Sequence, residues 1–86
     1  MNYGTVNYEG QTITLTQDAY RTSRLFDGCF QNVEMGEAYI DEWRAEGVDN
    51  QGNEVVVTWH FEQVKGQEME AEFLPWEDEK SIVEVV

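Results

Sequence analysis

Hydrophobic and polar residues alternate most regularly in the second half of the chain, over Glu54–Glu62. Val55, Val57, Trp59 and Phe61 occupy every second position and therefore share one side of the segment. β-branched and aromatic residues at a period of two are typical of a strand with one buried face. We therefore expect a strand here, with its apolar side turned toward the core.

The residues before this strand supply a turn and a pairing partner. Asp49–Gly52 reads Asp-Asn-Gln-Gly, a composition typical of turns. A strand that follows a turn needs a partner, so we expect Ala38–Val48 to form the other half of a hairpin. The alternative is a helix over Glu37–Gly47 capped by its glycine. A helical stripe is also present at Met35, Ala38, Tyr39 and Trp43.

Two shorter strands are predicted near the N-terminus. Tyr3–Tyr8 and Gln11–Thr16 flank Glu9-Gly10, a dipeptide that suits a tight hairpin connection. Gln17–Gly36 has no clean period and is interpreted as a loop, with one helical turn near Asp18–Leu25.

The C-terminal part combines an acidic segment with a closing strand. Glutamates alternate with apolar residues over Gln67–Phe73, which predicts an extended segment that Pro75 ends or confines to a sheet edge. Ser81–Val86 predicts a closing strand. Together, the elements predict one domain over residues 1–86 with a mainly β fold, an antiparallel sheet of about five strands with at most one short helix. A helix over Glu37–Gly47 would make the fold α+β.

Net charge excludes one class of ligand. The chain has 18 Asp and Glu residues against 5 Lys and Arg, a formal net charge of −13, and residues 34–86 carry all but one of these net charges. Nucleic-acid binding needs basic patches that displace counterions from phosphate, so we expect no direct contact with DNA or RNA. The charge also exceeds the magnitude of about 2 to 8 that keeps a small domain soluble. We therefore expect that the excess charge serves binding.

Reactive side chains are few. Cys29 is the only cysteine and His60 the only histidine, so the sequence offers no internal disulfide, no structural zinc site and no paired nucleophile and base. Asp49–Glu54 lacks the ligand spacing of a calcium loop. We expect a protein that is not an enzyme and needs no metal or cofactor, with His60 at the surface or in a structural hydrogen bond.

The location is inferred from three features. Met1–Gly4 carries neither a basic nor an apolar leader, and the longest aliphatic run, Val55–Val57, is too short to cross a bilayer. A single cysteine favours a reducing compartment. We therefore expect a cytoplasmic protein without membrane contact.

Carboxylates are the candidate binding groups. If Gln67–Phe73 is extended, its three glutamates lie on one side at intervals of roughly 6.6 to 6.8 Å, twice the rise per strand residue. Such a row presents spaced anionic oxygens, as a phosphate backbone does, to Arg and Lys of a partner. The predicted row contains Glu68, Glu70 and Glu72, is extended by Glu77, Asp78 and Glu79, and is joined by a second row from the long hairpin at Asp41, Glu42 and Glu46.

Two aromatic residues lie beside these acids. Phe73 and Trp76 would form the apolar centre of an interface with a charged rim. The alternatives are that Trp76 caps the core where Pro75 turns the chain, and that the acids are a solvated face that maintains solubility.

At "ITLTQDAY", "VDNQGNEVVVTW" and "PWEDEKSIVEV" the chain resembles small acidic proteins of phages and mobile elements, among them anti-CRISPR inhibitors. The resemblance covers about half of the chain. It implies stoichiometric inhibition of a Cas effector in the host bacterial cell, by occupation of its basic nucleic-acid-binding groove through DNA mimicry, which blocks DNA binding or cleavage. Three basic residues depart from a purely acidic mimic and leave room for a mixed interface: Arg21, Arg24 and Arg44.

The partner expected on this basis is a basic nucleic-acid-binding protein, and we expect the chain itself to be a monomer or a weak homodimer. The alternative function is a structural or assembly protein of a phage or mobile element. Such a protein would use the exposed Gln67–Val86 edge for strand addition to itself or to a partner.

Overall fold

The two longest strands of the computed structural model form the hairpin that the sequence predicts. The structure describes residues 3–86, so Met1 and Asn2, part of the predicted leaderless N-terminus, lie outside it. β4 (Ala38–Val48) and β5 (Glu54–Val64) pair in antiparallel register with Trp43 opposite Trp59. The strand interpretation of residues 37–47 is therefore confirmed over the helical alternative, and the fold is mainly β.

The turn between β4 and β5 is organised by one side chain. Asp49 Oδ1 accepts hydrogen bonds of 2.9 Å from the backbone N–H groups of both Gln51 and Asn53. These bonds hold the pKa of Asp49 below its usual range, the bond from Asn53 having the largest effect. An aspartate that satisfies turn amides in this way fixes where the hairpin reverses, and hence its register.

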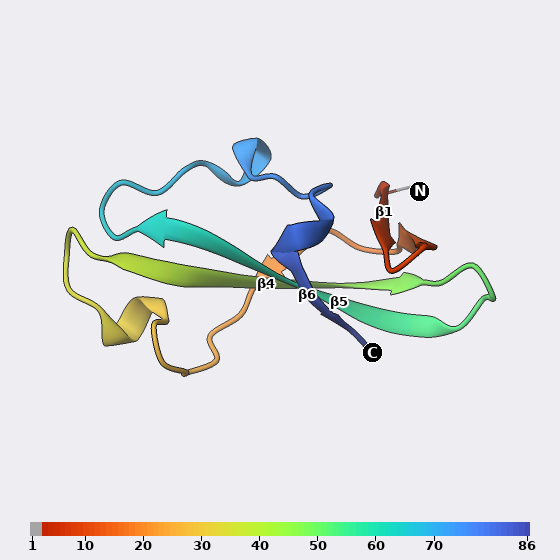
Figure 1. The fold of residues 1–86 in the computed structure, drawn as a ribbon, viewed down its shortest axis with the longest axis horizontal. Coiled ribbons are helices and arrows are strands. Elements are labelled where there is room, and N and C mark those ends of the chain that lie inside the picture. Colours follow the sequence, from red (N-terminus) through yellow and green to blue (C-terminus); the bar gives the residue numbers. More distant parts are fainter. Residues whose placement is uncertain (1–2) are drawn as a thin grey trace.

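Shorter strands complete a six-stranded antiparallel sheet, in the order β1-β2-β4-β5-β6, with β3 pairing β4 (Figure 1). The prediction of about five strands with at most one short helix therefore holds, because the helical pieces are three-residue 3₁₀ turns. The remaining elements are β1 (Thr5–Tyr8), β2 (Gln11–Leu15), β3 (Tyr20–Arg21), β6 (Ile82–Val85), η1 (Phe30–Asn32), η2 (Ala71–Phe73) and η3 (Glu79–Ser81).

The N-terminal hairpin is confirmed. β1 and β2 pair with Val6 opposite Ile13, and both residues of their connection, Glu9 and Gly10, have positive φ angles of 49° and 79°. Positive φ at both central positions is what the type I′ turn of a two-residue hairpin requires. Within residues 3–86 the ladder between β2 and β4 is short, with Thr14 opposite Val48 and Leu15 opposite Gly47.

The region expected to hold a helical turn is extended instead. Asp18–Leu25 contains the short strand β3, in which Arg21 pairs opposite Trp43 of β4. The Thr22 N–H continues the ladder by donating to the Glu42 carbonyl at 3.0 Å. Pairing with the free edge of β4 satisfies these backbone groups, whereas a single helical turn would leave most of its own unsatisfied.

The core lies on one face of the sheet. Val57, Trp59 and Phe61 of β5 are buried there, as the alternation predicts, and Val6 and Ile13 pack onto them. Leu74 closes the core from the chain between β5 and β6, which passes back over the sheet in Figure 1. This chain, residues 65–81, is named the acidic connection below.

The closing strand is also confirmed. β6 pairs the middle of β5, with Val85 opposite Val57 and a register shift between Thr58 and Trp59. Among residues 3–86, the helical segments are all too short to traverse a lipid bilayer.

Candidate functional site

The acidic connection is not a strand, so the predicted row of evenly spaced glutamates is wrong. Residues 67–70 have no regular structure, and η2 begins at Ala71, with Phe73 N–H bonding the Glu70 carbonyl at 2.9 Å. The segment is not a strand because its apolar residues do not all pack on the core. Leu74 is buried and Trp76 half-buried, whereas Met69 and Phe73 are exposed. The alternating apolar residues in 67–73 therefore do not pack as one face of a sheet.

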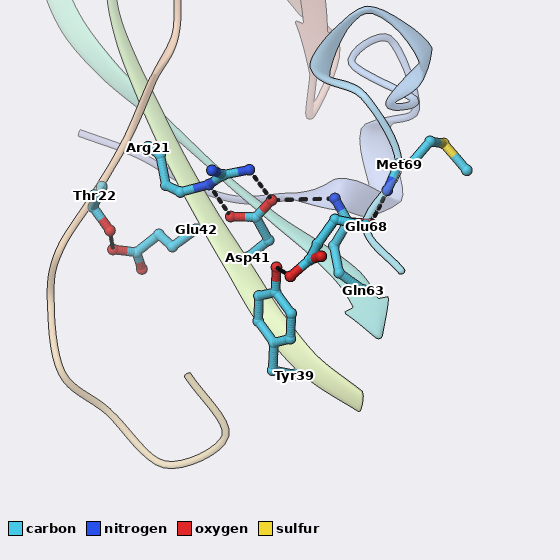
Figure 2. A network of polar contacts seen from close by, with 8 residues as sticks. All are labelled: Arg21, Thr22, Tyr39, Asp41, Glu42, Gln63, Glu68 and Met69. Carbon is cyan, nitrogen blue, oxygen red and sulfur yellow. Dashed lines mark hydrogen bonds and ion pairs between the residues drawn. The ribbon is translucent and has the colours of Figure 1, made fainter. Parts of the chain in front are cut away.

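Side-chain hydrogen bonds, and not strand pairing, attach the start of the acidic connection to β4 and β5. The Gln63 side chain of β5 accepts a hydrogen bond from the Met69 N–H at 3.0 Å and donates one to Asp41 at 3.2 Å. Tyr39 Oη donates to Glu68 Oε2 at 3.0 Å, as Figure 2 shows. These contacts fix the entry of the acidic connection against the end of the long hairpin.

Glu68 is consequently the most constrained of the acids in the acidic connection. Its side chain is exposed but also accepts a bond of 3.1 Å from the Gly66 N–H. Hydrogen bonds hold its pKa below the usual range, the backbone N–H of Glu68 itself contributing most, followed by the Tyr39 hydroxyl. Glu68 therefore stays ionised while also serving the fold.

Four other acids of the acidic connection make no such side-chain contacts within residues 3–86. Within residues 3–86 their carboxylates accept no hydrogen bond and form no ion pair, and all four are exposed. These free carboxylates are Glu70, Glu72, Glu77 and Glu79. Asp78 is exposed as well, but its Oδ1 caps η3 by accepting from the Lys80 N–H at 3.0 Å. The connection thus presents a dense but irregular group of anions.

The second predicted row is wrong for two of its three members. Asp41 is only 2% exposed and forms a two-pronged ion pair with Arg21, at 2.8 Å from Nε and 3.2 Å from Nη2 (Figure 2). This pair raises the pKa of Arg21, chiefly through the hydrogen bond to Asp41. A buried and neutralised carboxylate has no free oxygen to offer a partner's arginine.

Glu42 is likewise buried, at 3% exposure, on the opposite face of β4. It accepts from Thr22 Oγ1 at 2.8 Å and from Arg24 Nε at 3.0 Å, contacts Arg24 Nη2, and lies 2.7 Å from His60 Nε2. The Arg24 hydrogen bonds, with those of His60 and Thr22, lower the pKa of Glu42 to about 2 despite its burial. Glu46, the third member, is exposed.

His60 and Cys29 are held in structural settings. Besides its contact with Glu42, the His60 ring stacks on Phe26 at a centroid distance of 5.6 Å. The Cys29 thiol is buried where residue 29 bridges Ile40 of β4. Among the described residues, no group of three or more His, Cys, Asp or Glu side chains could hold a metal ion.

Trp76 is part of the core lid and not a protruding anchor. Its ring makes edge contacts with Trp43, Trp59 and Phe61 at centroid distances of 4.9 to 5.2 Å. Its Nε1 donates to the Ala71 carbonyl at 2.7 Å, and its own carbonyl accepts from Trp59 Nε1 at 3.0 Å. Phe73, in contrast, is 66% exposed. The two predicted anchors therefore differ in burial, and of the two only Phe73 is exposed to a partner.

A groove of about 400 Å³ opens beside Trp76, between the N-terminal hairpin and the acidic connection. Trp43 and Trp76 contribute to its lining, and Asp18, Glu72 and Glu77 supply its carboxylates. We refer to it as the aromatic groove. Sequence reasoning missed Asp18 and Trp43. The hairpin register offered a signal for Trp43, which it places opposite Trp59, but no local pattern links Asp18 to residues 72–77.

The chain matches no protein-family model, and comparisons of its sequence with curated proteins and of its structure with solved structures give no significant match.

Proposed function

We propose that the protein binds the basic nucleic-acid-binding groove of a Cas effector as a DNA mimic and blocks DNA binding or cleavage. The observation that carries this proposal is the state of its carboxylates. All but three of the 18 acidic residues are exposed, the exceptions being Asp41, Glu42 and the half-buried Asp49. Within residues 3–86 only Asp41 and Glu42 form ion pairs. Among the other carboxylates, Glu37, Asp49, Glu68 and Asp78 accept hydrogen bonds, and the rest have no side-chain partner within residues 3–86 and can meet cations of a partner.

The acidic connection is the proposed contact surface. It carries the exposed acids Glu70, Glu72, Glu77 and Glu79 in the same stretch of chain as the exposed Phe73 ring. Free anions around an apolar side chain resemble an interface in which charge steers the encounter and the apolar contact slows dissociation. Since the glutamates are not evenly spaced, the mimicry proposed here depends on the density of negative charge and not on the repeat of a phosphate backbone.

The proposed partner also defines the place of action. A Cas effector meets its target DNA in the cytoplasm of the bacterial cell, so the proposal includes a cytoplasmic location in the host. It involves neither a membrane nor direct contact of the chain with nucleic acid, and it requires no catalytic step.

Competition with DNA tests the proposal. A panel of guide-loaded Cas effectors is mixed with labelled target DNA and increasing amounts of the protein, and bound DNA is measured by fluorescence anisotropy. We expect stoichiometric displacement of DNA from at least one effector, with an affinity that falls as salt is raised. No displacement from any effector at low salt contradicts the Cas assignment.

A matched pair of variants tests the surface. Glu70, Glu72, Glu77 and Glu79 are replaced by Gln in one protein. The control replaces the same number of exposed glutamates that lack side-chain partners elsewhere, namely Glu9, Glu34, Glu54 and Glu62. At about 0.5 to 1 kcal/mol for each ion pair, the first variant weakens binding about 30- to 1,000-fold. Equal losses in both variants would mean that overall charge, not this surface, drives binding.

A second function is favoured by the sheet edge. Among the described strands β6 pairs only with β5, and Val83 on this edge strand is 46% exposed. An unpaired edge with an exposed apolar residue suits strand addition in a phage or mobile-element assembly. Within the predicted Gln67–Val86 edge only β6 is a strand, because the acidic connection is not one. Self-association that persists at high salt and is lost in Val83→Lys, measured by sedimentation velocity, would favour this function.

A further inference from the structure

The aromatic groove combines an apolar lining with an acidic one. Trp43 and Trp76 lie edge to face within it, with ring centroids 5.2 Å apart. Leu15 and Ala19 add apolar surface from the N-terminal side. An open groove of about 400 Å³ with indole surface in its lining has room for a partner's side chain.

The charge of this groove is one-sided. Its lining includes the carboxylates of Asp18, Glu72 and Glu77, and no Lys or Arg is among the described residues that line it. None of the three carboxylates has a hydrogen-bond or ion-pair partner within residues 3–86. Three free anions beside indole rings favour a cationic occupant, because both the carboxylates and the ring faces attract positive charge.

The same chemistry already occurs once inside the molecule. The guanidinium carbon of Arg21 lies 4.8 Å from the centre of the Trp43 ring, while its Nε and Nη2 bind Asp41. Arginine here stacks on an indole and pairs with a carboxylate at once. Arg21 does not line the aromatic groove, so the groove offers a similar combination of groups without a resident cation among the described residues.

We infer that the aromatic groove takes an arginine side chain of the basic partner, with the guanidinium against the indoles and its N–H groups on the groove carboxylates. This inference rests on the proposed function for its partner, and names the residue type that the partner inserts. Arginine is favoured over lysine because a planar guanidinium stacks on aromatic rings and donates to two carboxylate oxygens at once. The ammonium group of lysine is a compact and strongly hydrated point charge.

A titration with short peptides tests the inference on the full chain alone. The ¹⁵N-labelled protein is titrated with acetyl-Gly-Arg-Gly-amide, and the indole N–H signals are followed by NMR. We expect saturable shifts of the Trp43 and Trp76 signals, with binding about fivefold weaker for the lysine peptide and undetectable for the uncharged citrulline peptide. Equal affinity for the arginine and lysine peptides overturns the guanidinium assignment. Shifts with citrulline overturn the role of charge.

Two triple variants locate the binding site. Asp18→Asn, Glu72→Gln and Glu77→Gln together are expected to weaken arginine-peptide binding about fivefold or more. The control with Glu9→Gln, Glu34→Gln and Glu54→Gln removes the same charge from other exposed positions and is expected to stay within about twofold of the parent protein. Equal weakening in both triple variants overturns the assignment to the groove.

The outcomes separate this inference from the proposed function. Peptide binding in the groove without displacement of DNA from any Cas effector supports the arginine site and contradicts the Cas assignment. Displacement of DNA by a protein that shows no indole shift with the arginine peptide supports DNA mimicry and overturns the arginine site.

Discussion

Glu42 and His60 face each other across the long hairpin, with Glu42 Oε2 2.7 Å from His60 Nε2. Thr22 and Arg24 approach the same carboxylate from the loop that follows β3. A single buried carboxylate therefore joins both central strands to a loop that has little regular structure of its own.

The pH dependence of stability follows from this carboxylate. The pKa of Glu42 is lowered from 4.5 to about 2 on folding, so its contribution is present above pH 4.5 and is lost as the pH falls toward 2. Glu42→Gln should lower the free energy of unfolding at pH 7 on the order of 3 kcal/mol, and the difference should shrink through this window. Urea unfolding followed by circular dichroism at several pH values measures it. Glu62→Gln is the exposed control, and equal behaviour of the two variants contradicts the role of Glu42.

Replacement of Trp76 and Phe73 distinguishes a core residue from a surface residue. Trp76→Ala removes a ring that contacts three other aromatic rings and should cost about 3 kcal/mol of stability. Phe73→Ala should change stability by about 0.5 kcal/mol or less, because its ring is 66% exposed. Thermal unfolding and near-ultraviolet circular dichroism measure both effects. Destabilisation by Phe73→Ala equal to that by Trp76→Ala would show that Phe73 is packed in solution.

Gly47 controls how closely β2 approaches β4. A Cβ atom at this position would lie 2.7 Å from the Thr14 carbonyl oxygen and 3.0 Å from Ile13 Cγ2. Gly47→Ala should therefore push the N-terminal hairpin away and cost about 1 to 3 kcal/mol. In Gly47→Ala, amide hydrogen exchange should accelerate more in β1 and β2 than in β5. Glu46→Ala, a change at the exposed neighbouring position, should leave exchange unaltered, and unchanged exchange in Gly47→Ala would contradict the tight contact.

Self-repulsion should make the fold sensitive to salt. At −13 the protein carries far more charge than its few ion pairs balance, and the screening length falls from about 30 Å at 0.01 M salt to about 3 Å at 1 M. The melting temperature should rise with sodium chloride, by about 4 to 8 °C for each kcal/mol of relieved repulsion. The increase should be smaller in either of the quadruple glutamine variants. A melting temperature that falls as salt is added would mean that the ion pairs of Arg21 and Arg24 outweigh the repulsion.

The strands with a buried face could be predicted from the sequence. In β5 the apolar positions recur at a period of two because one face packs on the core, and Asp49 marks the reversal that sets the register. Over Gln67–Phe73 the same period is present, but the segment makes no strand pairing. Periodicity identifies a strand only where a neighbouring edge and an apolar surface exist to receive it.

The candidate site was harder to predict because its state depends on contacts between distant residues. Asp41 and Glu42 have the same local composition as an exposed acidic pair. Their burial is explained by pairing with Arg21 and Arg24, about twenty residues earlier, and by further contacts from Gln63, Thr22 and His60. The free acids of the connection were identified correctly as exposed, and no side chain within residues 3–86 pairs with them. Charge composition alone cannot separate these two groups of carboxylates.

The pairing of Arg21 with Asp41 and of Arg24 with Glu42 has a consequence for local motion. Each pair matches one positive with one negative group, so the segment that carries both arginines is electrically balanced against the strand on which it rests. If this segment were to detach briefly, the total charge would be the same before and after, and a distant cation would feel nearly the same attraction. Brief detachment of this segment should therefore leave the long-range electrostatic attraction between the glutamates and a cationic partner nearly unchanged.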